Sequence, residues 1–192
     1  MGGITFLRPT REGNRLMPLT PDALLALLDA QAIPAETFSH PPLRTVAESK
    51  ALRGSVPGAH TKNLFLRDAK KNYFLVTAAA DAEVNLKSLR APLGARGSLS
   101  FGTPEALFEY LGVLPGSVTL LALANDPDHR VTFAIDSALL RAEAVGCHPL
   151  TNTRTTVLTP QALRSFFALT GHQPVLLDLP SLAHDALQPV AG

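Results

Sequence analysis

The chain has 192 residues, of which 46% are hydrophobic, and a formal net charge of +1. This length suits a single globular domain with a sizeable core, and the near-zero charge excludes a chain that is basic or acidic throughout. The longest apolar runs are too short to span a bilayer and the first residues lack signal-peptide order, so we expect a cytoplasmic protein without a membrane partner.

The first part of the chain contains one well-marked element. Residues 1–18 show no clear periodicity, and we expect a poorly ordered lead-in there. A helix is predicted over residues 19–31, because Thr20 can cap it and Pro21 suits its first position. Two shorter elements should follow: a strand over residues 35–42 and a helix over residues 46–53 with the spacing of a capping box.

A hairpin is predicted next. Leu64–Arg67 and Tyr73–Val76 are β-rich runs separated by residues 68–72. Lys62 would then lie where a loop becomes the first strand. Three further elements should follow: a short helix over residues 82–94, a short strand over 98–101, and a helix over 102–112 that begins at Thr103 and ends at Gly112.

The remaining elements complete a mixed fold. The nearly continuous apolar run 117–126 predicts a strand. The elements expected after it are strands over residues 130–136 and 147–158, a helix over 159–171 and a closing strand over 174–179. Helices and strands alternate irregularly, so we predict an α/β (α+β mixed) fold with a central mixed, mainly antiparallel sheet flanked by helices. One domain over residues 19–182 and a tail over 183–192 are expected.

The charges are unevenly distributed. Residues 50–71 hold six Lys and Arg against one Asp, so this segment carries +5 and the rest of the chain −4. A solvated face explains such a block, and so does a surface that meets a polyanion.

The sequence lacks the motifs of several common kinds of active site. No dinucleotide or Walker-type glycine loop and no Gly-x-Ser-x-Gly elbow is present, and the six histidines lack metal-ligand spacing, so neither cofactor nor metal is expected. Cys147 precedes His148, but adjacent residues of a strand point to opposite faces. We therefore interpret Cys147 as a buried thiol; a cysteine hydrolase remains a further alternative.

Three stretches, over residues 39–78, 99–126 and 146–167, together resemble the YbaK/ProX-type aminoacyl-tRNA editing domains. The likeness is greatest to the free-standing Ala-tRNA(Pro) deacylases, also called prolyl-tRNA synthetase associated domain proteins. The resemblance implies hydrolysis of the ester of a mischarged tRNA, with the substrate's own 2′-hydroxyl assisting a water. The implied partners are the acceptor end of tRNA(Pro) and, as a further candidate, prolyl-tRNA synthetase.

The resemblance also implies the site. Lys62 corresponds to the family's functional lysine, Gly116 to its glycine-containing loop and His148 to its third motif. Further substrate contacts are expected from Asn63, Ser117, Val118, Thr119, Asn152 and Thr155, and tRNA contacts from Arg53, Arg67, Lys70, Lys71 and Lys87.

One position departs from the family's pattern. The loop commonly reads Gly-x-x-x-Pro, and here Leu120 occupies the fifth position while Pro115 precedes the glycine. The rigidity of the loop is therefore open, since proline fixes φ. A non-catalytic tRNA-binding or synthetase-associated module of the same fold is the alternative function, and the sequence leaves open alanine, serine or another small residue as the amino acid removed.

Overall fold

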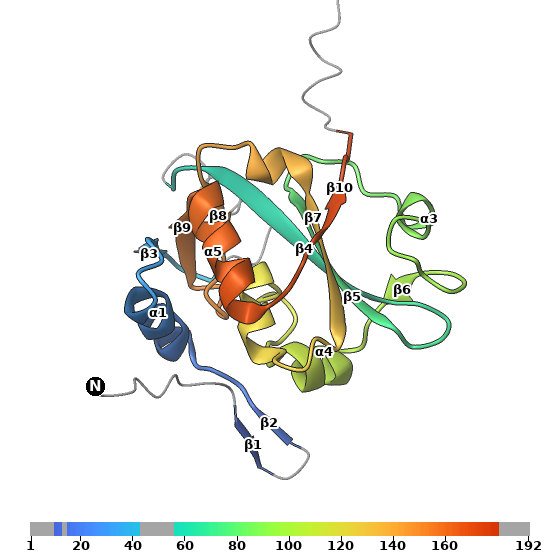
Figure 1. Ribbon diagram of the computed structural model, residues 1–192, viewed down its shortest axis with the longest axis horizontal. Coiled ribbons are helices and arrows are strands. Elements are labelled where there is room, and N and C mark those ends of the chain that lie inside the picture. Colours follow the sequence, from blue (N-terminus) through green and yellow to red (C-terminus); the bar gives the residue numbers. More distant parts are fainter. Residues whose placement is uncertain (1–9, 13–14, 43–55, 181–192) are drawn as a thin grey trace, which may run out of the picture.

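The computed structural model describes residues 10–12, 15–42 and 56–180. Its centre is a mixed sheet flanked by helices, which confirms the fold class (Figure 1). The strand order is β10-β7-β5-β4-β8-β9-β3, and β6 pairs with β4 off this path. Parallel pairs join β10 to β7, β7 to β5 and β4 to β8, whereas the other pairs of this sheet are antiparallel.

The helices begin where their capping residues predict. Thr20, Thr103 and Thr159 each accept a hydrogen bond from a backbone N–H in the first turn, and a proline follows each of them. The last two of these helices end at glycines with positive φ. The helices are α1 (Pro21–Ala30), α3 (Leu86–Leu89), α4 (Pro104–Leu111) and α5 (Pro160–Thr170), with 3-10 turns η1 (Leu120–Asn125) and η2 (Ser137–Leu140).

The strands include the predicted hairpin. β4 (Ala59–Arg67) and β5 (Tyr73–Ala79) pair antiparallel along seven residues. The other strands of the sheet are β3 (Glu36–Ser39), β6 (Ser100–Phe101), β7 (Val131–Asp136), β8 (Val145–Cys147), β9 (Arg154–Leu158) and β10 (Val175–Leu177).

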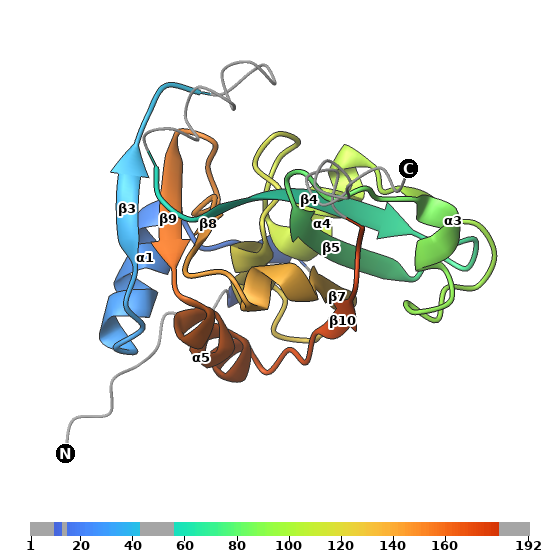
Figure 2. The same cartoon turned by 90° about the horizontal axis from the view of Figure 1, so that it is seen from above.

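Apolar side chains pack on both faces of the sheet. One cluster joins Leu75 and Phe133 of the sheet to apolar side chains of α1, α4 and α5. On the opposite face, Leu89 of α3 packs on Phe74 and Val76. Figure 2 shows α3 beyond the β4–β5 hairpin and α1 and α5 at the other end of the molecule. Apolar side chains thus cover both faces of β4 and β5.

Three predictions need correction. The apolar run 117–126 is a loop followed by η1 rather than a strand, because Thr119 caps a turn whose six residues are all buried. Residues 147–158 form the end of β8, a loop and β9 rather than one strand. Residues 10–12 and 15–17, expected to be poorly ordered, pair as β1 (Thr10–Glu12) and β2 (Arg15–Met17).

Other predictions fall outside the described residues. These are the helix over residues 46–53, most of the lead-in and the tail over residues 183–192. Within the described part of the chain, no helix is both long enough and apolar enough to cross a bilayer.

The buried Asn125 supports a stability prediction. Its side chain accepts from the N–H of Leu19 (2.8 Å) and donates to the carbonyl of Leu111 (3.0 Å). Asn125→Ala should lower the free energy of unfolding by about 3 kcal/mol, because two buried backbone groups lose their partners. Urea unfolding followed by circular dichroism measures this, with the exposed helix cap Asn85→Ala as a control that costs about 1 kcal/mol. A loss below the control's would contradict the argument.

Candidate active site

Strand β4 carries the predicted Lys62 and Asn63 at a point where the sheet opens. Along one edge β4 pairs with β5. Along the other, Ala59 and His60 pair with β8, and Leu66 and Arg67 pair with β6. Between these, no described strand pairs with β4. The sequence suggested that Lys62 lies at the start of the strand, but the structure places it inside β4. It lies beside an interruption in the pairing of the sheet.

The backbone of Asn63 faces this interruption. The carbonyl of His60 accepts from Ala80, which follows β5, and the carbonyl of Phe65 accepts from Gly102, which follows β6 (both 2.9 Å). Alternate residues of β4 thus direct their peptide groups to opposite edges. Asn63 is in phase with Phe65, so its N–H and C=O point away from β5.

The side chains of Lys62 and Asn63 point to opposite faces of the sheet. Asn63 accepts from the hydroxyl of Thr77 (2.7 Å) on the face that carries the larger apolar cluster. Lys62 lies on the other face, where its ammonium donates to the carbonyl of Ala82. Lys62 is half-buried. The two adjacent residues therefore cannot act as one side-chain pair, and Asn63 can reach a ligand at the open edge through its backbone.

His148 lies just past the end of β8, next to β4. Thr61 donates from its hydroxyl to the carbonyl of Gly146 (3.0 Å), and His60 pairs with Gly146 in parallel register. Lys62 lies two residues after His60 on β4, and His148 lies two residues after Gly146, so both residues follow paired positions of neighbouring strands.

Burial lowers the pKa of His148, and nearby His40 lowers it further, whereas a hydrogen bond to the carbonyl of Arg154 raises it. That bond joins Nδ1 to the carbonyl oxygen at 3.2 Å. Because a carbonyl only accepts, Nδ1 carries the ring proton and Nε2 of the neutral ring is an acceptor. His148 is thus arranged as a neutral hydrogen-bonding group.

His40 is a neighbour that the sequence did not single out. Its Nε2 is 2.9 Å from the hydroxyl of Thr155, and its backbone N–H donates to the carbonyl of Thr153 (2.9 Å). Thr155, a predicted substrate contact, is only 4% exposed, so its hydroxyl serves His40. No local pattern marks His40, because its partners come from β9, more than a hundred residues away.

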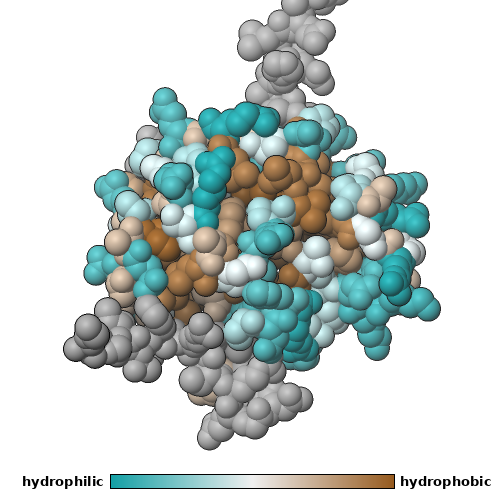
Figure 3. Space-filling view, in the orientation of Figure 1, coloured by the Kyte–Doolittle hydropathy of each residue, from teal (hydrophilic) through white to brown (hydrophobic). Residues whose placement is uncertain are grey.

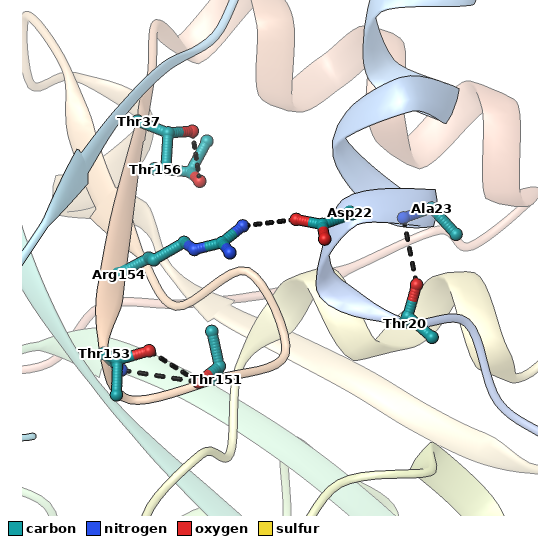
Figure 4. A network of polar contacts seen from close by, with 8 residues as sticks. All are labelled: Thr20, Asp22, Ala23, Thr37, Thr151, Thr153, Arg154 and Thr156. Atoms are coloured by element: carbon teal, nitrogen blue, oxygen red, sulfur yellow. Dashed lines mark hydrogen bonds and ion pairs between the residues drawn. The ribbon is translucent and has the colours of Figure 1, made fainter.

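The glycine loop contacts the segment that follows His148. A Cβ on Gly116 would lie 3.7 Å from Nδ2 of Asn152, which joins two of the predicted site segments. Arg154 pairs with Asp22 of α1, Thr37 with Thr156, and Thr151 with Thr153, and these contacts hold the Asn152 loop and β9 in place (Figure 4).

The loop is rigid without a proline at position 120. Ser117 donates its backbone N–H to the carbonyl of Leu114 (3.0 Å), and Gly116 has φ +89°. Pro115 followed by a glycine of positive φ is the signature of a type II turn. Leu120 is fully buried in η1. Pro115 therefore restricts φ in this loop, whereas the family's pattern has its proline at the position of Leu120.

The rest of the loop turns inward. Val118 packs against the larger apolar cluster, and the buried Thr119 uses its hydroxyl to cap η1 by accepting from Leu121 (3.2 Å). Ser117 is half-buried. Within residues 116–119, Gly116 is thus the exposed residue. Gly116 lies near Asn152, whereas Lys62 bonds to Ala82, so a shared site for these two predicted catalytic residues stays a prediction.

The predicted tRNA contacts lie at the other end of the hairpin. Arg67 ends β4, and Lys70 and Lys71 follow in the turn. Lys62 and Arg67 are five residues apart, or about 17 Å along a strand. Lys87 is exposed on α3, and Arg53 lies outside the described residues. Over residues 10–12, 15–42 and 56–180, no group of three or more His, Cys, Asp or Glu side chains is arranged to hold a metal ion.

The thiol of Cys147 should be unreactive in the folded protein. Burial raises the pKa of Cys147 to about 12, and the side chain is 2% exposed. At pH 8 a thiol reagent such as Ellman's should therefore label the native chain at least ~100-fold more slowly than the same chain unfolded in urea. Equal rates would place the thiol in an accessible site and revive the cysteine-hydrolase alternative.

The pKa of His148 should lie below the ordinary histidine value of about 6.5. An NMR titration of the ring Hε1 protons measures it, with His148→Gln identifying the resonance. Since the unfolded chain binds the proton more tightly, the wild type should lose more stability than His148→Gln when pH falls from about 7.5 to 5.5. A midpoint at or above 6.5 would show that the ring is not arranged as described.

Comparisons with known proteins identify the family. Residues 40–166 match the family described as "Aminoacyl-tRNA editing domain". The chain is 42% identical over 160 residues to "Prolyl-tRNA synthetase associated domain-containing protein 1" of Bos taurus, covering 81% of this chain and 93% of that protein. It is 32% identical over 151 residues to "Prolyl-tRNA editing protein ProX" of Acetoanaerobium sticklandii, covering 78% and 92%.

The fold agrees with this relationship. The solved structure of hypothetical protein APE2540 has a TM-score of 0.64 at 22% identity, covering 81% of this chain and 97% of that one. The resemblance found in the sequence is confirmed: the chain belongs to the aminoacyl-tRNA editing domain family.

Proposed function

We propose that this protein hydrolyses the ester bond of a mischarged tRNA in trans, and that its substrate is Ala-tRNA(Pro). The family relationship and the ProX relative support the reaction class. The structural observation that carries the proposal is the grouping of its site segments. Thr61 binds the β8 carbonyl two residues before His148, and a Cβ on Gly116 would lie 3.7 Å from the amide nitrogen of Asn152, four residues after His148.

This region suits an ester that is already activated. An aminoacyl ester needs a positioned water and stabilisation of the developing oxyanion, with no protein nucleophile. Burial removes Cys147 from such a role. Hydrolysis then adds water across the ester, which releases the amino acid and leaves the free ribose hydroxyl at the tRNA end.

Each side chain has a role consistent with its surroundings. The Lys62 ammonium uses one of its three N–H groups on the Ala82 carbonyl, which orients the others toward a phosphate or the developing oxyanion. The neutral His148 ring offers an acceptor for the amino group or the water. The exposed backbone of Gly116 and the open edge at Asn63 offer peptide groups for the acyl carbonyl.

Selection of alanine over proline requires a second, smaller sieve. A synthetase pocket built for proline rejects alanine weakly, because lost apolar contact changes binding by only about 1–3 kcal/mol. Hydrolysis of the smaller residue after release corrects the error. Arg67, Lys70, Lys71 and Lys87 are proposed to contact the tRNA backbone, which adds affinity without sequence information.

A deacylation assay tests the proposal. Ala-tRNA(Pro), Ser-tRNA(Pro) and Pro-tRNA(Pro) are incubated with the wild type, Lys62→Ala and the charge-matched control Arg164→Gln. We expect release of alanine, little release of proline, and a fall of about 100-fold or more for Lys62→Ala, because a charge that stabilises the transition state is lost. Arg164 is exposed on α5, so Arg164→Gln should match the wild type.

The outcomes separate the candidate functions. Binding of tRNA without release of any amino acid would identify a non-catalytic module. Release of serine rather than alanine would retain the hydrolysis and correct the substrate. An unchanged rate for Lys62→Ala would remove Lys62 from the site.

A further inference from the structure

A cavity of about 550 Å³ lies at the hairpin end of the sheet, away from Lys62 and His148. Its walls come from the β4–β5 turn, the turn after α3, α4 and the start of β7. Three cations, Lys71, Arg96 and Arg130, line it together with the polar Asn72 and Thr132. No carboxylate is among the lining residues of the described chain. In Figure 3 hydrophilic side chains dominate this right-hand end of the molecule.

A buried aspartate organises the turn that carries Lys71. Asp68 accepts from the backbone N–H of Lys70 (2.8 Å) and Asn72 (3.0 Å), from the Asn72 amide (2.8 Å), and from the backbone N–H of Arg96 (2.8 Å). Burial by itself raises the pKa of Asp68, but these hydrogen bonds lower it to about 2. The carboxylate therefore stays ionised while its oxygens are committed to the backbone.

A second buried aspartate holds Arg130 in the same way. Asp126 accepts from the backbone N–H of Arg130 (2.9 Å) and of Val131 (2.8 Å). The backbone N–H groups of Arg96 and Arg130 are thus both held by hydrogen bonds to buried carboxylates. Such a site is pre-organised, because little backbone freedom is lost when a ligand binds.

Lys71 occupies a backbone conformation that its residue type disfavours. Its φ is +62°, where glycine or asparagine would be less strained. The turn keeps a lysine there although the conformation lowers stability. Strain at a single residue is a feature of functional sites, and here it places an ammonium at the cavity.

The aromatic side chains of the cavity contact one another. The guanidinium carbon of Arg130 lies 3.9 Å from the ring centroid of Tyr110. The ring centroids of Tyr110 and Tyr73 are 4.4 Å apart, and Tyr73 stacks on Phe65. Since these rings are already engaged, they offer little surface for stacking a base. Arg130 also donates to Glu109 (2.9 Å), which leaves further N–H donors of its guanidinium for an anion.

We infer that this cavity binds a phosphate group through Lys71, Arg96 and Arg130. Guanidinium groups match phosphate oxygens in geometry, and the three cations line the cavity whereas no carboxylate of the described residues does. The phosphate can come from an RNA backbone, in which case the inference rests on the proposed function, or from a free phosphate anion.

The test uses three substitutions in the full chain. Arg96→Gln and Arg130→Gln remove the guanidinium groups. Lys71→Asn removes the ammonium and tolerates positive φ, so this variant should fold at least as well as the wild type. Arg164→Gln removes an equal charge from the exposed surface of α5 and is the matched control.

One arm measures RNA binding by the fluorescence anisotropy of a labelled RNA duplex with a single-stranded CCA end, between about 50 and 200 mM KCl. Each cavity variant should weaken binding by about 3- to 10-fold and reduce the salt slope by about 1. The other arm titrates sodium pyrophosphate calorimetrically into the wild type and Lys71→Asn. Arg164→Gln should match the wild type in both arms.

Each outcome decides the inference. Loss of RNA affinity in the cavity variants supports an RNA phosphate. Pyrophosphate binding that Lys71→Asn abolishes, with RNA affinity unchanged, supports a free anion. Changes within twofold in both arms would overturn the site. A protein that releases no amino acid but loses RNA affinity in these variants would refute the proposed hydrolysis and retain the phosphate site.

Discussion

The pairing of β4 constrains the rest of the structure. One edge of this nine-residue strand is bonded to β5, and the other is shared between β8 at its start and β6 at its end. A peptide group can bond only to the edge that it faces, so on the edge away from β5 the middle of β4 has no strand partner in the described chain. The predicted Lys62 and Asn63 lie at this interruption.

The site segments are joined by small polar contacts. The Thr61 hydroxyl links β4 to β8, and the Nδ1 of His148 links the end of β8 to β9. Hydroxyl and imidazole groups are directional, so each contact fixes an orientation that apolar packing would leave free. A site that positions one water and one carbonyl requires fixed side-chain orientations more than it requires a larger free energy of unfolding.

The positive charge is divided between two places. Residues that form one basic block in the sequence lie about 17 Å apart along β4, because an extended strand separates Lys62 from Arg67. Lys62 remains with the candidate active site, whereas Lys70 and Lys71 join Arg96 and Arg130 at the hairpin end. A long polyanion could engage both ends at once, and a small ligand could engage only one.

Local chemistry in the sequence determined the long helices and the main hairpin. Thr20, Thr103 and Thr159 cap helices through contacts within four residues, and the pairing of β4 with β5 joins strands that are neighbours in the sequence. The family was also found from the sequence, because three motifs stand in the order that is typical of it.

Tertiary structure alone decided the rest. Residues 117–126 have the apolar character of a strand, but the six residues of η1 are all buried, and the compact turn satisfies peptide groups within itself. The bond from Lys62 to the Ala82 carbonyl, the partnership of His40 with Thr155 and the contact of Arg130 with Tyr110 all depend on residues brought together across the fold. Such contacts leave no periodic trace in the sequence, because no local spacing encodes them.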